Sequence, residues 1–281
     1  MSELIPKSLV IAFLLIQSSI ILSTTEDEKY VIGFGSCITE KREQPIWEAI
    51  KDENIDEFFF MGDNVYGDSE DGLLEEMKAS YEKQKQMFPK WVFNKKLNAI
   101  WDDHDYGKND GGAEYPLKDK AQELFLKFWN VDSKDPRHNR KGIYFNEEKE
   151  ILGHKVNLIA LDTRYHRSPL GQESKPYSAV DDKTKTMLGE GQWQWLNDVI
   201  KRESDLIIIV SSIQVMATDH GFEKWHNFPY ERLRRLALLE VQNKPVIIPS
   251  VTGVNKVLNV ILSRFTPALA KANIGIIKKA T

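Results

Sequence analysis

Residues 57–68 read EFFFMGDNVYGD, a mostly apolar run followed by a glycine and a group of polar residues. The run from Glu57 to Met61 lacks the strict alternation of a half-exposed strand and is typical of a strand covered on both faces. Such strands belong to α/β sheets, in which ligand sites form at the carboxyl ends of the strands. The polar residues that follow Met61 therefore stand where we expect a functional site.

Similar apolar runs recur along the chain, and stretches with helical periodicity separate most of them. The predicted strands are 30–36, 57–61, 98–101, 156–162, 206–211 and 245–248. The predicted helices are 45–51, 73–87, 117–129, 191–202 and 230–241. The segment 162–185 carries Pro169, Gly171 and Pro176 among polar residues, which indicates a long loop. No interdomain linker or internal repeat is visible, so we expect one α/β domain.

The charge balance argues against one class of partner. The 281 residues include 38 Lys and Arg against 42 Asp and Glu, which gives a formal net charge of −4. A protein whose main partner is a nucleic-acid backbone carries a basic surplus. We therefore expect no nucleic-acid binding.

The first 24 residues have the pattern of a secretory signal peptide. An uncharged apolar run over 9–22 follows Lys7 and precedes the acidic stretch 26–28. The run is shorter than the ~20 residues that a spanning helix needs, so we interpret 1–24 as a cleaved signal and 25–281 as the mature, secreted domain. Membrane attachment would follow only if this segment were not cleaved. The chain has one cysteine and hence no internal disulfide, so Cys37 is either a buried thiol or a sulfur ligand.

Three polar clusters each follow an apolar run directly. They are Gly35-Ser36-Cys37, Gly62-Asp63-Asn64-Val65-Tyr66 and Asp102-Asp103-His104-Asp105. If their strands share a sheet, the clusters converge on one crevice that holds a thiol, a phenol, an imidazole and several carboxylates. Carboxylates at that density repel one another unless a cation lies among them. The sequence thus predicts a metal site.

The mixture of donor types limits the choice of metals. Carboxylate oxygens suit magnesium, calcium or manganese, whereas thiolate, phenolate and imidazole favour iron or zinc. This combination indicates two unlike metals, or a ferric ion beside a second cation. A pair of metals a few ångströms apart is the arrangement that phosphoester hydrolysis uses.

Six stretches together resemble the PhoD-like (alkaline phosphatase D) branch of the calcineurin-like metallophosphatases. They are GFGSC (33–37), FFFMGDNVYGD (58–68), AIWDDHDYGKNDGG (99–112), LIALDTRYHR (158–167), GEGQWQWL (189–196) and WHNFPYER (225–232). The resemblance spans residues 31–248. It implies a β-sandwich flanked by helices in an α/β/β/α arrangement, and an extracytoplasmic enzyme that uses ferric iron and calcium to hydrolyse phosphate monoesters or diesters.

The same resemblance implies roles for particular residues. Cys37, Asp63, Tyr66 and Asp103 would be the metal ligands, with Cys37 and Tyr66 on iron and Asp63 between the metals. His104, Asp105 and Arg164 would be the catalytic residues, with Asp105 orienting His104. Asn64 and Arg164 would bind the substrate, because a guanidinium matches phosphate oxygens. The residues leave open whether other divalent metals bind instead.

The C-terminal tail departs from the family pattern. The strand after WHNFPYER should end in Gly-Asp-x-His, whose Asp and His complete the metal ligands, but no Asp or His occurs in the tail 249–281. His220 and His226 are the candidates to replace them. We also expect this C-terminal part of the fold to be incomplete, which would leave an unpaired sheet edge.

The family resemblance and the missing ligands together leave two possible functions. The first is a secreted phosphatase in which a metal-activated hydroxide attacks the phosphorus of a small phosphate ester in line. The alternative is a catalytically impaired family member or isoform that acts as a binding or decoy protein. The sequence does not distinguish monoesters from diesters.

Overall fold

The computed structural model describes residues 29–250, apart from 70 and 72, and the backbone of two further strands at 257–263 and 273–277. The first sheet has the order β3-β2-β1-β8-β9, and the second has the order β4-β5-β6-β7. The strands of the first sheet are β1 (Lys29–Gly35), β2 (Glu57–Met61), β3 (Lys96–Ile100), β8 (Val257–Ser263) and β9 (Asn273–Ile277). The strands of the second are β4 (Phe145–Ile151), β5 (His154–Ala160), β6 (Leu206–Val210) and β7 (Val246–Ile247).

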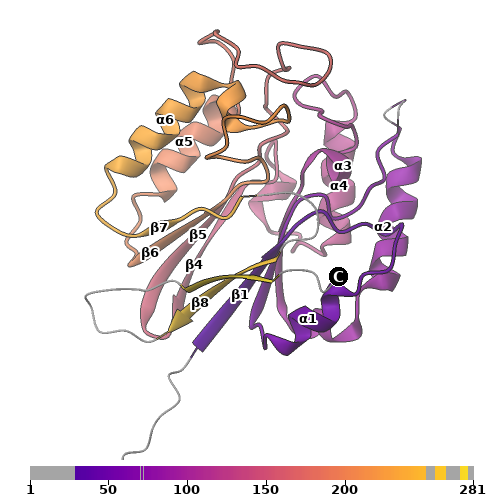
Figure 1. Ribbon diagram of the computed structural model, residues 1–281, viewed down its shortest axis with the longest axis vertical. Helices are drawn as coiled ribbons and strands as arrows, with labels where there is room; N and C mark the ends of the chain where they lie inside the picture. The colour runs from indigo at the N-terminus through magenta and orange to yellow at the C-terminus, as the bar shows by residue number, and fades with distance from the viewer. Residues whose placement is uncertain (1–28, 70, 72, 251–256, 264–272, 278–281) are drawn as a thin grey trace, which may run out of the picture.

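Helices cover the outer face of each sheet (Figure 1), with α5 and α6 beside the second sheet and α1 to α4 beside the first. The α-helices are α1 (Ile46–Asp52), α2 (Glu75–Met87), α3 (Asp103–Tyr106), α4 (Lys118–Phe128), α5 (Gly189–Val199) and α6 (Pro229–Glu240). Short 3-10 helices lie at Lys90–Asn94, Pro136–His138 and Trp225–Asn227. The four layers confirm the predicted α/β/β/α sandwich.

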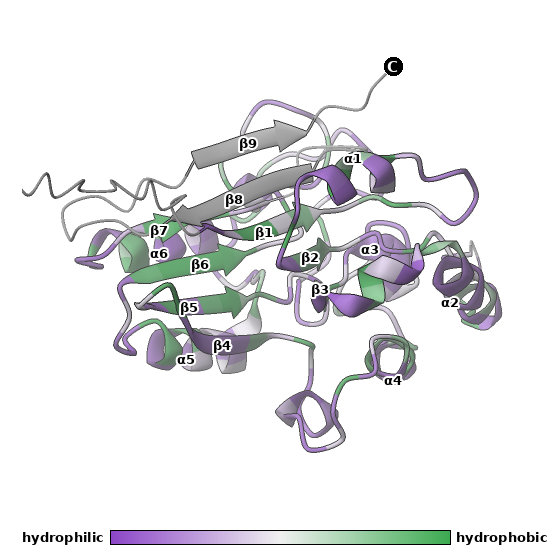
Figure 2. Ribbon diagram, turned by 90° about the horizontal axis from the view of Figure 1, so that it is seen from below, coloured by the Kyte–Doolittle hydropathy of each residue, from purple (hydrophilic) through white to green (hydrophobic). Residues whose placement is uncertain are grey.

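Strand β2 shows why its sequence does not alternate. Phe59 faces the second sheet, where its ring stacks on that of Phe145 with 6.2 Å between the ring centroids. On the other face, the rings of Phe58 and Phe60 pack against Trp47 of α1, with centroid distances of 5.6 and 6.1 Å. All five residues of β2 are buried because both faces of the strand are covered. The same is true of β6, and Figure 2 shows β5 and β6 as predominantly hydrophobic.

The predicted strands and helices are all present, with boundaries that differ by at most three residues. Strand β4 was not predicted because its sequence, FNEEKEI, is charged on a half-exposed edge of the second sheet. Segment 162–185 contains no helix or strand, as expected of a long loop.

The tail corrects one expectation. Strand β8 pairs antiparallel with β1 from Lys29 opposite Ser263 to Gly35 opposite Val257, and β9 pairs in turn with β8. The expected unpaired edge beside β1 is therefore absent from the described part of the sheet. The tail supplies backbone partners although its sequence lacks the family's ligands.

The predicted signal peptide lies outside the described residues, so its cleavage stays a prediction. Within the described ranges, none of the helices has the length and apolar character needed to cross a membrane.

Candidate metal centre

The three predicted clusters meet at one edge of the first sheet. Strands β1, β2 and β3 run parallel, so their carboxyl ends lie side by side. The loops after β1 and β2 are joined by two backbone hydrogen bonds, from Cys37 N to Gly62 O at 3.1 Å and from Ile38 N to Asp63 O at 3.0 Å. Gly62 has φ of +105°, and a Cβ atom there would lie 2.6 Å from the Cβ of Asp102. A glycine is therefore required where the second and third clusters touch.

Asp63 is the point on which the other donors converge. Its Oδ2 atom accepts hydrogen bonds from the Cys37 thiol at 3.4 Å and from the Tyr66 hydroxyl at 3.3 Å, and its Oδ1 atom accepts one from His104 N at 3.4 Å. Asp63, Asp103 and the His104 ring also place one potential ligand atom each within 4.8 Å of one another. The structure thus brings together all four residues that the sequence predicted as metal ligands.

Burial makes this cluster a poor place for uncompensated negative charge. It raises the pKa of the Cys37 thiol and of the Tyr66 phenol, and neighbouring Asp63 raises both further. The pKa of Asp63 itself is raised well above its ordinary value by burial and by Asp103 and Asp102. Burial and the neighbouring acidic groups thus disfavour the ionised forms of all three groups, and a metal ion would favour those forms. Thiolate, phenolate and carboxylate donors in one place fit iron.

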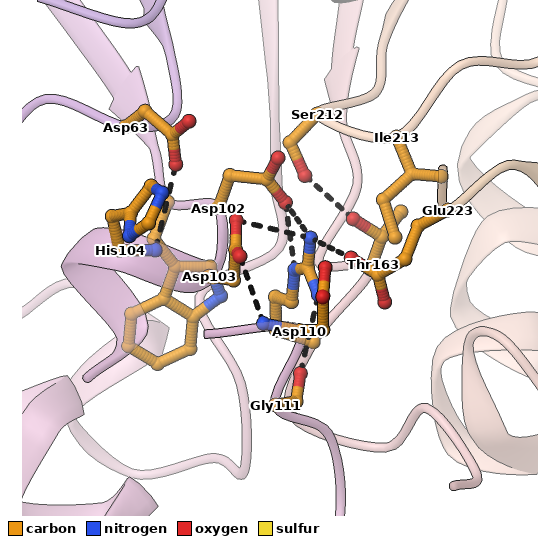
Figure 3. A network of polar contacts seen from close by, with 12 residues as sticks. Asp63, Asp102, Asp103, His104, Asp110, Gly111, Thr163, Ser212, Ile213 and Glu223 are labelled. Atoms are coloured by element: carbon orange, nitrogen blue, oxygen red, sulfur yellow. Dashed lines mark hydrogen bonds and ion pairs between the residues drawn. The ribbon is translucent and has the colours of Figure 1, made fainter. Parts of the chain in front are cut away.

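Arg164 balances the neighbouring carboxylates. Its Nε donates to Asp102 Oδ1 at 2.6 Å, and its Nη2 lies 3.4 Å from Asp103 Oδ1 and 2.7 Å from Glu223 Oε2. Figure 3 shows Asp102, Asp103 and Glu223 in this network of polar contacts. Burial opposes the ionisation of Asp103, but Arg164 and His104 outweigh burial and lower its pKa. Asp103 is therefore an anionic donor before any metal binds.

The expected contact between Arg164 and phosphate stays a prediction. The side chain is 1% exposed, and its donors contact carboxylates and the carbonyl oxygen of Gly111. In this arrangement the guanidinium holds Asp102 and Asp103 in place.

His104 has a different partner from the one expected. Its Nδ1 lies 2.8 Å from Asp68 Oδ1, and its ring centroid lies 4.2 Å from that of Tyr66. Burial alone would lower the pKa of His104, but the hydrogen bond to Asp68 and the charges of Asp103 and Asp63 raise it to about 9. The expectation that Asp105 orients His104 is therefore wrong, because Asp68 occupies that place.

Asp105 instead organises the turns behind the cluster. It is fully buried and accepts hydrogen bonds from the backbone N–H groups of Asp63 at 3.1 Å, Asn64 at 3.3 Å and Asp102 at 2.6 Å. Burial raises the pKa of Asp105 to about 8, although the N–H groups oppose that shift. The Asp105 carboxylate thus joins the loops that carry the metal donors.

Asn64 belongs to the same framework. Its side chain is fully buried, and its Nδ2 donates to Ile100 O at 2.9 Å and to the Asp105 carboxylate. The amide nitrogen of Asn64 points into the protein, and the predicted contact between Asn64 and substrate stays a prediction.

A second acidic group adjoins the first. Asp103, Asp110 and Glu223 also bring one carboxylate oxygen each within 4.8 Å of the others, so Asp103 belongs to both groups. Cations surround this group, because Arg167 lies 3.2 Å from Glu223 and Lys175 lies 3.2 Å from Asp110. Glu223 and Asp68 were not predicted as site residues, because neither stands directly after a strand. Only the folded loops bring them to the site.

The candidate replacements for the missing family ligands lie elsewhere. Nε2 of His220 lies 2.9 Å from Gln214 Oε1, and its Nδ1 accepts a hydrogen bond of 3.2 Å from the backbone N–H of Phe222. Neither His220 nor His226 belongs to the two acidic groups found among the described residues. Residues 251–256, where the Gly-Asp-x-His sequence was expected to begin, lie outside the described residues.

Comparison with known proteins agrees with the fold. The sequence profile described as PhoD-like phosphatase matches residues 97–248, which is more than half of the chain. A solved structure titled "Structure of PhoD" superposes with a TM-score of 0.64 at 16% sequence identity, covering 79% of this chain and 50% of that one. This chain thus spans about half the length of that protein. No curated protein sequence gives a significant match. The chain belongs to the PhoD-like phosphatase family.

Proposed function

We propose that this chain is a secreted, metal-dependent phosphatase that hydrolyses small phosphate mono- or diesters. The observation that carries the proposal is the convergence of the Cys37 thiol and the Tyr66 hydroxyl on one oxygen of Asp63. Such a donor set has no evident structural purpose, since burial disfavours the ionised form of each group and a cation would stabilise that form. Membership in a phosphatase family supports the choice of substrate class.

The donor chemistry divides between two ions. Cys37, Tyr66 and Asp63 would hold ferric iron, and Asp103 together with Asp63 would hold calcium through oxygen atoms alone. Asp110 and Glu223 extend the oxygen donors beside Asp103. When bound, the ions supply Lewis-acid activation and neutralise charge on the phosphoryl oxygens.

The remaining steps rest on the protein's own side chains. Asp68 fixes Nδ1 of His104, so the opposite nitrogen, Nε2, is the one available to a substrate. In the metal-free protein, the hydrogen bond to Asp68 and the charges of Asp103 and Asp63 raise the pKa of His104. The protonated imidazole would be the group that donates a proton to the leaving alkoxide. Arg164 orients Asp102 and Asp103, and it lowers the pKa of Asp103 against the effect of burial.

The alternative is a binding or decoy protein with an incomplete site. It is favoured by one observation, namely that residues 249–281 contain no Asp or His. Loss of two metal ligands would lower the affinity for at least one metal. The loss would exceed the roughly 10- to 100-fold that is typical when a residue hydrogen-bonded to a metal ligand is replaced.

Metal analysis combined with turnover separates the two functions. Purified mature protein is supplied with iron and calcium, its metal content is measured, and release of 4-nitrophenol is followed from 4-nitrophenyl phosphate and from its bis ester. We expect near-stoichiometric iron with calcium, and hydrolysis that a chelator abolishes. The variant Asp63→Asn should lose metal and turnover, whereas Asp52→Asn, on an exposed position of α1, should not. Bound metal without turnover would favour the decoy, and turnover that resists chelation would refute the metal mechanism.

A further inference from the structure

A cavity of about 350 Å³ opens directly beside the candidate metal centre. Its wall is formed by Cys37, by Tyr66 and by the segment that connects β1 to α1. Its volume lies within the range of roughly 300–1,000 Å³ that small-molecule sites occupy. A phosphate ester held at the metal centre can therefore extend its organic part into this space.

The wall has an apolar part and a cationic part. Ile38, Pro45 and Ile46 are apolar, whereas Lys41 and Arg42 are exposed cations that outnumber the single carboxylate, Glu43. In the part of the chain that the structure describes, no hydrogen bond or ion pair involves the side chain of Lys41 or Arg42. Their charges are therefore available to a ligand.

The amide of Gln44, which also lines the cavity, is not available. Its Nε2 donates to Thr39 O at 3.0 Å and to Gln84 Oε1 at 2.8 Å, while its Oε1 accepts the indole N–H of Trp47 at 2.8 Å. Within this wall, the two cations are thus the polar groups that most favour an anion.

The wall is held in a fixed relation to the metal centre. The buried carboxylate of Glu40 accepts hydrogen bonds from the backbone N–H of Tyr66 and from the Ser80 hydroxyl, each at 3.0 Å. These bonds connect the β1–α1 segment to the loop after β2 and to α2. Gln44 ties the same segment to α2 through Gln84. Lys41 and Arg42 are therefore carried by a backbone that is anchored on both sides of them.

We propose that this cavity receives the leaving group of the phosphate ester, and that Lys41 and Arg42 select leaving groups that carry a further negative charge, such as a carboxylate or a second phosphate. The inference rests on the proposed function, since it names the class of substrate at the same site. The apolar residues accommodate the carbon skeleton, and the cations contact the distal anion near the rim. Charges at an exposed rim act mainly on the capture of substrate.

Two esters that differ in one charge test the inference. The substrates are 4-carboxyphenyl phosphate and the uncharged analogue 4-carbamoylphenyl phosphate, with release of phosphate measured for both. In the double variant Lys41→Gln/Arg42→Gln, we expect kcat/KM for the carboxyl ester to fall about three- to tenfold and kcat/KM for the carbamoyl ester to change less than about twofold. The effect should shrink as salt is added. The control Lys127→Gln/Lys201→Gln removes two exposed charges outside the cavity and should alter neither value.

A binding measurement keeps this test separate from the proposed function. Calorimetry with 4-carboxyphenylphosphonate and 4-carbamoylphenylphosphonate should show tighter binding of the carboxyl compound, and the double variant should remove the difference. If neither ester is hydrolysed but this preference is present, the proposed catalysis fails and the anion subsite stands. Equal losses on both esters, or the same affinity for both phosphonates in the unmodified protein, would overturn the subsite.

Discussion

The Sγ atom of Cys37 lies 3.4 Å from Oδ2 of Asp63, and both residues have left-handed backbone conformations, with φ of 58° and 51°. Non-glycine residues rarely adopt such angles, and each instance costs on the order of 1 kcal/mol or more. The hydrogen bonds that join the loops after β1 and β2 hold both residues in place. The thiol and the carboxylate are thus preorganised by the backbone, which is the arrangement expected of a binding site.

Asp63 and Asp103 should respond oppositely to neutralisation in metal-free protein. The folded-state pKa of Asp63 is raised, so its ionisation costs stability as the pH rises above about 4. We expect Asp63→Asn to raise the free energy of unfolding by about 1 kcal/mol at neutral pH. Asp103→Asn should lower it by about 1–3 kcal/mol, because the ion pair with Arg164 is lost. Urea unfolding in chelator measures both, and destabilisation by Asp63→Asn would contradict the assignment.

The pKa of His104 should depend on Asp68. In metal-free protein we expect a value near 9, and Asp68→Asn should move it down toward the ordinary value of about 6.5. Because the folded pKa is the higher one, the stability that His104 contributes is complete below about pH 6.5 and is lost as the pH rises through 9. Titration of the imidazole signals by NMR checks the shift. Asp105→Asn serves as the comparison, and an equal or larger shift there would restore Asp105 as the partner.

Asp105 should matter for stability more than its position beside His104 suggests. Asp105→Ala leaves three buried backbone N–H groups without their acceptor, and we expect a loss of at least about 3 kcal/mol. The control Asp52→Ala, on the exposed side of α1, should change stability by less than about 0.5 kcal/mol. Thermal unfolding followed by circular dichroism gives the comparison. A change in turnover at unaltered stability would show that Asp105 is catalytic instead.

Arg235 should be replaceable with a gain in stability. Its guanidinium is 1% exposed, has no hydrogen-bond partner among the described residues, and lies 4.8 Å from the ring centroid of Trp225. Burial, with a smaller effect of Arg232, lowers its pKa to about 9. We expect Arg235→Met to raise the free energy of unfolding by about 1–2 kcal/mol, because a buried charge is removed while the packing is kept.

The control for Arg235 is Arg164, a buried arginine that pairs with carboxylates of the metal centre. Arg164→Met should lower the free energy of unfolding by about 3–5 kcal/mol, since it leaves buried carboxylates unpaired. Denaturant unfolding distinguishes the two results. Destabilisation of similar size in both variants would mean that Arg235 has a partner of comparable strength.

Local sequence was sufficient for most of the framework. Runs such as EFFFM in β2 and LIIIV in β6 are buried on both faces, and this double burial is visible as an unbroken apolar run. The charged edge strand β4 and the strands β8 and β9 escaped prediction, because their identity depends on the neighbours with which they pair. The sequence of a strand does not show with which distant segment that strand pairs.

The sequence by itself determined the α/β layers, the three polar clusters and the convergence of Cys37, Asp63, Tyr66 and Asp103, because residues that directly follow parallel strands must share one sheet edge. Only the tertiary structure decided which charges meet. It assigned Asp68 to His104, surrounded Arg164 with three carboxylates and placed Asn64 and Asp105 behind the site. These pairings are set by loops that cross from separate strands, and the distance between two side chains on different loops is a property of the fold and not of their spacing along the chain.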